Sequence, residues 1–207
     1  MGTIFKDLTD VQLDALKEVT HIGAASAVTA LSQFINKTVT MSPAVIVGFN
    51  SEHVPQLTSR EAPRNTVVFL EISGNIPGKI FIVIDGKSIV FFTGLLLGKG
   101  VTSEVLSEMD ISAIKEVATV MSGSHLKSLG EIVNTVFHMD PPSFEYSGSE
   151  NILKVVNSHC SDKEDEPICF RSDFFACHGA EKLNGSVLFM LLGASLRNLA
   201  QAVMPNV

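Results

Sequence analysis

The 207-residue chain has no tryptophan, one tyrosine and three cysteines, and charged residues make up only 18% of it. The cysteines, Cys160, Cys169 and Cys177, are odd in number and form no C-x-x-C pattern. They indicate neither a disulfide framework nor a zinc site, so we expect reduced thiols. Lysine and arginine form no run, and the net charge is −7. This composition argues against nucleic acid as a partner.

Long hydrophobic runs are also absent. The longest apolar stretches, such as residues 80–84 and 187–192, fall far short of the ~20 residues that a membrane-spanning helix needs. The first ten residues lack the basic start and apolar centre of a secretion signal. We therefore expect a cytoplasmic protein that does not insert into a membrane. A hydrophobic fraction of 45% still allows a large core, with some apolar surface left for an interface.

What the sequence does contain is an internal duplication. DALKEVTHIGAAS, which begins at Asp14, recurs 98 positions later as SAIKEVATVMSGS, which begins at Ser112. GKIFIVIDGKSIVFF, from Gly78, recurs as GSVLFMLLGASLRNL, from Gly185, at an offset of 107. Two copies of about a hundred residues are too few and too long for a solenoid. We predict a single domain over residues 1–207, made of two repeats at about 8–100 and about 106–205.

Each repeat is expected to contain a long helix, three strands and a short helix. Helix signals open at Thr9 or Asp10 in the first copy, and Asp110 is the predicted cap in the second. Strands are predicted at residues 38–49, 66–73, 78–84, 134–146, 168–177 and 185–192, and the tight turns between them favour antiparallel pairing. The predicted fold class is α/β, a duplicated domain with pseudo-two-fold symmetry. It combines a six-stranded, largely antiparallel sheet with two long helices packed together on one face.

Polar side chains recur on one face of the two long helices. They stand at positions i, i+4 and i+7, as Asp14, Glu18 and His21 in the first copy and as Ser112, Glu116 and Thr119 in the second. A single copy would indicate only a solvated helix surface. Glu18 and Glu116 agree although several neighbouring residues differ, and this agreement favours a functional role.

This pattern resembles the signature of the CheC, CheX and FliY family of chemotaxis phosphatases. That signature is an Asp or Ser, a Glu four positions later, an Asn three positions further on, and then a proline after a fixed gap. Twenty-two residues separate Thr119 from Pro142, and one fewer separates His21 from Pro43. The resemblance covers essentially the whole chain. Two motif copies are typical of the CheC branch, whereas CheX keeps one active copy.

The resemblance implies a protein that docks on the phosphorylated response regulator CheY and hydrolyses its aspartyl phosphate. Glu18 and Glu116 would contact the regulator's active-site lysine, and the residue at the Asn position would orient the attacking water. Asp14 and Ser112 would belong to the docking surface. Mg²⁺ would be supplied by the regulator, and no metal or cofactor of the chain's own is implied. CheD, a receptor deamidase, is implied as a second partner.

The sequence departs from the family at the Asn, which is His21 in one copy and Thr119 in the other. Threonine is too short to place a water well, whereas histidine can donate, accept or act as a base near neutral pH. If either copy is active, the first is favoured. Three interpretations stay open. The chain is a working phosphatase, or a degenerate CheC homologue that binds phosphorylated CheY or CheD without catalysis, or a structural part of the flagellar switch. We expect no further domain after Val207, and this expectation disfavours the third.

Overall fold

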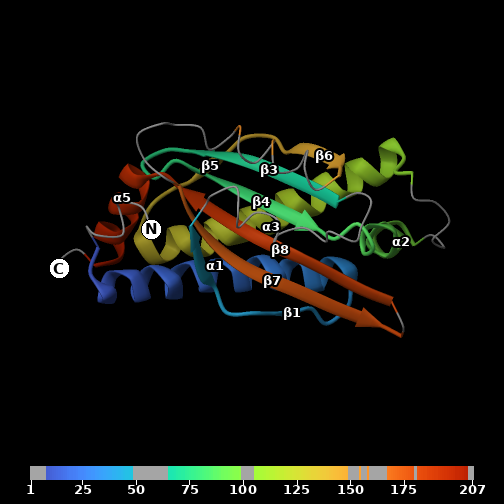
Figure 1. Cartoon of the computed structure of the whole chain (residues 1–207), viewed down its shortest axis with the longest axis horizontal. Coiled ribbons are helices and arrows are strands. Elements are labelled where there is room, and N and C mark those ends of the chain that lie inside the picture. The colour runs from blue at the N-terminus through green and yellow to red at the C-terminus, as the bar shows by residue number, and fades with distance from the viewer. Residues whose placement is uncertain are drawn as a thin grey trace.

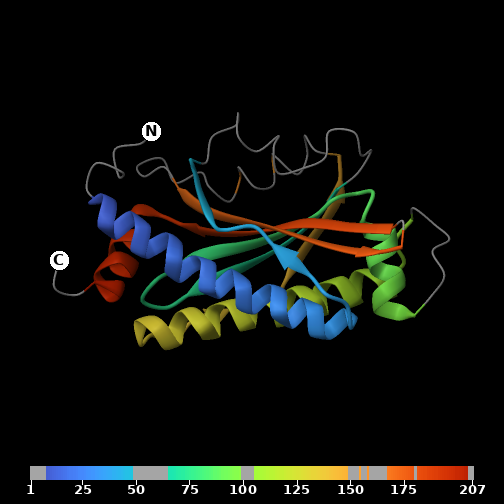
Figure 2. The ribbon, with the colours of Figure 1, turned by 90° about the horizontal axis from the view of Figure 1, so that it is seen from below.

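The computed structural model describes residues 8–48, 65–98, 105–148, 167–179 and 181–204, together with the single residues Lys154 and Ser158. In this part of the chain, two long helices lie on one face of a sheet (Figures 1 and 2). No described helix is long and apolar enough to cross a membrane. Cys169 is buried and Cys177 is exposed, while Cys160 lies outside the described residues.

The two long helices, α1 (Asp10–Ile35) and α3 (Glu108–Val133), have 26 residues each and begin in the same way. Thr9 caps α1 and Ser107 caps α3, each in a capping box with the side chain three residues later. The cap predicted for α3 is therefore wrong by three residues. Asp110 lies inside the first turn, where its carboxylate accepts a hydrogen bond from the Ser107 N–H at 2.8 Å.

In the part of the chain that the structure describes, the sheet has eight strands instead of the predicted six. Their bounds are β1 (Thr40–Met41), β2 (Val45–Gly48), β3 (Asn65–Ser73), β4 (Gly78–Ile84), β5 (His138–Met139), β6 (Ser143–Ser147), β7 (Ile168–His178) and β8 (Glu181–Leu191). The two extra strands arise because two of the predicted segments are each split at proline. Residues 38–49 are split at Pro43, and residues 134–146 are split at Pro141 and Pro142. Proline has no N–H to donate to a ladder, so pairing stops there. The predicted α/β class is confirmed.

The two repeats exchange strands. The sheet order is β1-β7-β8-β4-β3-β5, with β2 also paired to β7 and β6 to β3, and the pairs are antiparallel. The first strands of each repeat thus pair with a strand of the other repeat. Equivalent backbone bonds mark both exchanges, Ser42 N–H to Asp173 O at 2.8 Å and Asp140 N–H to Glu71 O at 2.9 Å. Neither repeat has its own complete sheet.

The main core lies between the helix pair and one face of the sheet. Ile80, Ile82 and Ile84 of β4 belong to it, while the alternate residues Phe81 and Val83 belong to a smaller cluster on the other face. This alternation is the two-residue period of a strand that is buried on both sides. The shorter helices α2 (Ile89–Leu97) and α5 (Gly193–Val203) lie at opposite ends of the long pair (Figure 2).

The predicted packing of the two long helices against each other is confirmed. They run in opposite directions (Figures 1 and 2), and Ser26 Oγ lies 2.5 Å from Ser128 Oγ between them. Small residues at the contact allow this approach: a Cβ atom on Gly23 would lie only 3.0 Å from Nε2 of His125. The helix pair therefore forms a closely packed layer whose outer side is turned away from the sheet.

Candidate docking faces on the paired helices

The structure brings the predicted residues of each copy onto the outer side of one helix. We call Asp14, Glu18 and His21 the first motif face, and Ser112, Glu116 and Thr119 the second motif face. In both faces the first two side chains are exposed and the third is half-buried. The equivalent burial of the two sets follows from the equivalent position of each helix on the sheet.

The two motif faces are separate sites. Two contacts mark the relative level of the antiparallel helices. Gly23 lies against His125, and Ser26 lies against Ser128. Glu18 and Glu116 precede the first contact by five and nine residues and the second by eight and twelve, so 14 or 20 residues of helix separate them. At 1.5 Å of rise per helical residue, the two glutamates lie about 20–30 Å apart along the pair. The two glutamates are therefore too far apart to belong to a single site.

The two glutamate carboxylates are available to a partner. Within the described residues, neither Glu18 nor Glu116 forms an ion pair or a hydrogen bond. The neighbouring Lys17 is instead paired with Asp14, with Nζ 2.9 Å from Oδ1. That pair is solvent-exposed, with 76% of the Asp14 side chain accessible, so it adds little stability. In the second copy Ser112 replaces Asp14, and Lys115 has no equivalent acid three residues before it.

The residues at the Asn position differ in what they offer to a water molecule. The Thr119 hydroxyl donates to the Lys115 carbonyl oxygen at 2.9 Å, so its hydrogen is used within the helix and only the oxygen can accept. His21 is half-buried, and its Nδ1 is buried without a partner among the described residues. Nε2 is then the ring nitrogen on the outer side. The first motif face thus presents an imidazole nitrogen, and the second presents only a hydroxyl oxygen.

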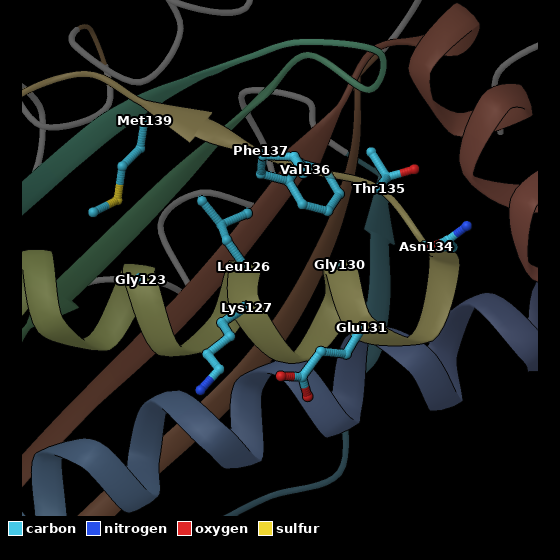
Figure 3. A pocket seen from close by; sticks show the side chains of 10 residues that line it. All are labelled: Gly123, Leu126, Lys127, Gly130, Glu131, Asn134, Thr135, Val136, Phe137 and Met139. Atoms are coloured by element: carbon cyan, nitrogen blue, oxygen red, sulfur yellow. The ribbon is translucent and has the colours of Figure 1, made fainter.

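A groove of about 490 Å³ continues along α3 beyond the second motif face (Figure 3). It opens at Gly123, one turn after Thr119, and the chain that follows the helix forms its other wall. Leu126, Phe137 and Met139 line it, whereas the side chains of Lys127 and Glu131 point the other way, toward α1 (Figure 3). The described residues contain no group of three or more His, Cys, Asp or Glu that could hold a metal ion.

Sequence reasoning missed two apolar residues on the motif faces. Val11 is 62% exposed and Met109 is 60% exposed, and each precedes the motif glutamate of its helix by seven residues. A spacing of seven residues places them on the same side of the helix as Glu18 and Glu116. The sequence carried the signal, because both copies have an apolar residue at a position that a solvated helix face would make polar.

Comparisons with known proteins find relatives among chemotaxis and flagellar switch proteins. The model of the CheC-like family matches residues 11–46, which include the first motif face. The CheY-P phosphatase CheC of Bacillus subtilis is 27% identical over 94% of this chain and 100% of its own length. The flagellar motor switch phosphatase FliY of the same organism is 26% identical over 67% of this chain, but the match spans only 36% of FliY.

Solved structures share the fold. FliY from Thermotoga maritima has a TM-score of 0.74 at 19% identity, covering 97% of this chain and 99% of that one. A chain of the CheX–CheY–BeF3–Mg complex from Borrelia burgdorferi has a TM-score of 0.52 at 16% identity, covering 82% of this chain and 95% of that one. The family predicted from the sequence is confirmed: the chain is related to the CheC, CheX and FliY proteins.

Proposed function

We propose that this protein is a CheC-like phosphatase that docks on a phosphorylated response regulator of the CheY type and hydrolyses its aspartyl phosphate. The observation that carries the proposal is the equivalent exposure of Glu18 and Glu116, both unpaired within the described residues, on the outer sides of α1 and α3. A carboxylate held on a rigid helix forms a charge-assisted contact with an active-site lysine and sets the docking register. The similarity to a CheY-P phosphatase over the whole of its length supports the same partner.

Hydrolysis requires a water placed in line with the bond between phosphorus and the aspartyl oxygen. At the first motif face, Nε2 of His21 accepts a hydrogen bond from that water and takes its proton as the water oxygen bonds to phosphorus. The bond to the aspartyl oxygen breaks, which releases inorganic phosphate and restores the regulator's carboxylate. Mg²⁺ belongs to the regulator, where it neutralises charge on the phosphoryl oxygens. No metal or cofactor of this chain is required.

The first motif face is the site of turnover in this proposal, and the second serves mainly to bind. Positioning dominates phosphoryl transfer, and a misplacement of about 1 Å can cost ~100-fold in rate. Thr119 is shorter than the family's asparagine, and its hydroxyl hydrogen is bonded to the Lys115 carbonyl. It therefore holds the attacking water less well than His21.

The alternative is a degenerate homologue that binds phosphorylated CheY, CheD or both without catalysis. The absence of the asparagine carboxamide from both copies favours it, together with the bonded hydroxyl of Thr119. The docking role of Glu18 and Glu116 is common to both functions. No described residue identifies a contact with CheD. A cytoplasmic location also stays a prediction.

One assay separates the two functions. Phosphate release is measured from the CheY-type regulators of the source organism, charged with acetyl phosphate, with the protein at catalytic concentration. The phosphatase predicts turnover that is lost in the double variant Glu18→Lys, Glu116→Lys and kept in Glu145→Lys. Glu145 is a suitable charge-reversal control because it pairs with Val67 on the sheet face opposite the helix pair.

The remaining outcomes of that assay are equally decisive. Binding without phosphate release from the wild-type protein supports the degenerate homologue, and the double variant His21→Asn, Thr119→Asn should then gain turnover. A wild-type protein that neither binds nor dephosphorylates any charged regulator contradicts both functions.

A further inference from the structure

We infer that Val11 and Met109 are contact residues for the docked regulator, so that each motif face extends two helical turns toward the start of its helix. This inference rests on the proposed function and adds an apolar contact to it. Among the large apolar residues of the described part of α1 and α3, these two are the most exposed. They occupy equivalent positions, 98 residues apart.

The duplication makes the exposure informative. The first helical turns around these residues are acidic, with Asp10 beside Val11 and with Glu108 and Asp110 on either side of Met109. Contact with water does not stabilise an apolar side chain, so its exposure in this turn of both copies needs another explanation. The two copies differ in side chain, valine against methionine, but both keep an apolar surface. Burial against a partner is the physical gain that explains this shared feature.

The spacing defines the partner surface. Seven residues of helix separate each apolar residue from its glutamate, which corresponds to about 10 Å along the helix axis. The partner must therefore present an apolar patch about 10 Å from the lysine that contacts Glu18 or Glu116. The acidic residues around Val11 and Met109 complement positive charge at the edge of that patch. A receiver domain docked through its active-site lysine is the occupant to which we commit.

The contact is tested with binding measurements on the full chain. The probes are the CheY-type regulators of the source organism, charged with BeF₃⁻ and Mg²⁺. Truncation of an apolar contact at the centre of an interface commonly weakens binding about tenfold. We therefore expect the double variant Val11→Ser, Met109→Ser to bind about tenfold more weakly than wild type with an unchanged melting temperature.

The control is Val45→Ser, Phe175→Ser. These two residues are 50% and 44% exposed. They lie on the sheet face opposite the helix pair, because Val45 shares its strand face with Val47 and Phe175 shares its strand face with Cys169. The control should bind the charged regulator as wild type does.

The possible failures are distinguishable. If Val11→Ser, Met109→Ser binds as wild type does while Glu18→Lys, Glu116→Lys does not bind, the apolar contact is wrong and the proposed function stands. If wild-type protein binds no charged regulator, both are wrong. If light scattering shows a wild-type dimer that the Val11 and Met109 substitutions dissociate while regulator binding is unchanged, a second copy of this chain is the occupant and the inference is overturned.

Discussion

Gly23 of α1 lies directly against the imidazole of His125 in α3, so that a Cβ atom at Gly23 would approach three ring atoms within 3.0–3.1 Å. His125 is 1% exposed, and neither ring nitrogen has a hydrogen-bond partner in the described structure. Its ring also lies 5.1 Å from that of Phe189, measured between centroids. The repeat equivalents of Gly23 and His125 are Met121 and Ala27. At both positions α3 carries the larger residue and α1 the smaller one.

The first prediction concerns Gly23→Ala. Alanine normally improves a helix interior by up to ~1 kcal/mol relative to glycine. Here the added methyl group overpacks the His125 ring, and we expect the free energy of unfolding to fall by about 1–3 kcal/mol. Urea unfolding of a double-mutant cycle checks the cause. In a His125→Ala background the same substitution should no longer destabilise the protein, and an equal loss in both backgrounds would contradict the contact.

His125 should also make the stability depend on pH. Burial lowers its pKa from 6.5 to about 4, so the unfolded chain takes up the proton at a higher pH than the folded one. The free energy of unfolding should therefore fall as the pH decreases from about 6.5 to about 4, and this contribution should level off below pH 4. The full effect is about 3 kcal/mol. His125→Met should flatten the profile between pH 7 and pH 4.5 in urea unfolding, and an unchanged slope would contradict the assignment.

Gly130 and Gly123 of α3 should respond in opposite directions to alanine. A Cβ atom on Gly130 would lie 2.5 Å from the Thr135 carbonyl oxygen, whereas one on Gly123 would lie 3.6 Å from the Met139 methyl group, an ordinary contact. We expect Gly130→Ala to destabilise by about 1–3 kcal/mol and Gly123→Ala to stabilise by up to ~1 kcal/mol. Thermal unfolding of the two variants gives the comparison directly. Equal changes in the melting temperature of the two variants would show that the protein relieves the close approach at Gly130 without losing stability.

The separation of the two motif faces predicts the binding stoichiometry. Because Glu18 and Glu116 lie about 20–30 Å apart along the helix pair, the wild-type chain should bind two BeF₃⁻-charged regulators. Glu18→Lys and Glu116→Lys should each reduce the ratio to one, and the double variant should bind none. Native mass spectrometry measures these ratios. A ratio of one in wild type that only one of the substitutions abolishes would show that a single face is used.

Local features of the fold could be predicted from the sequence because they depend on residues close together in the chain. The start of α1 was correct, since Thr9 and its capping box lie within four residues. The cap of α3 was placed at Asp110 because aspartate is a good cap, but Ser107 holds that position and Asp110 completes the box. The predicted strand count is too low because prolines divide two of the six predicted segments, 38–49 and 134–146.

Parts of the candidate site could not be predicted from the sequence. The repeat identified the motif residues and placed them on one side of each helix. It did not reveal that the Thr119 hydroxyl is bonded to its own helix or that Nδ1 of His21 is buried, because both depend on side-chain orientation. Val11 and Met109 were overlooked because an apolar residue in a helix is normally assigned to the buried side.

The sequence by itself determined the two helices, their equivalent glutamates and the similarity of the chain to known proteins, since periodicity, caps and motif spacing are properties of short segments. Only the tertiary structure decided that the repeats exchange strands, that α1 and α3 run in opposite directions, and that the two motif faces lie apart. These features depend on contacts between residues about a hundred positions apart, such as Gly23 with His125 and Ser42 with Asp173. No local pattern specifies such pairings, because they form only when the two halves complete one sheet and one core together.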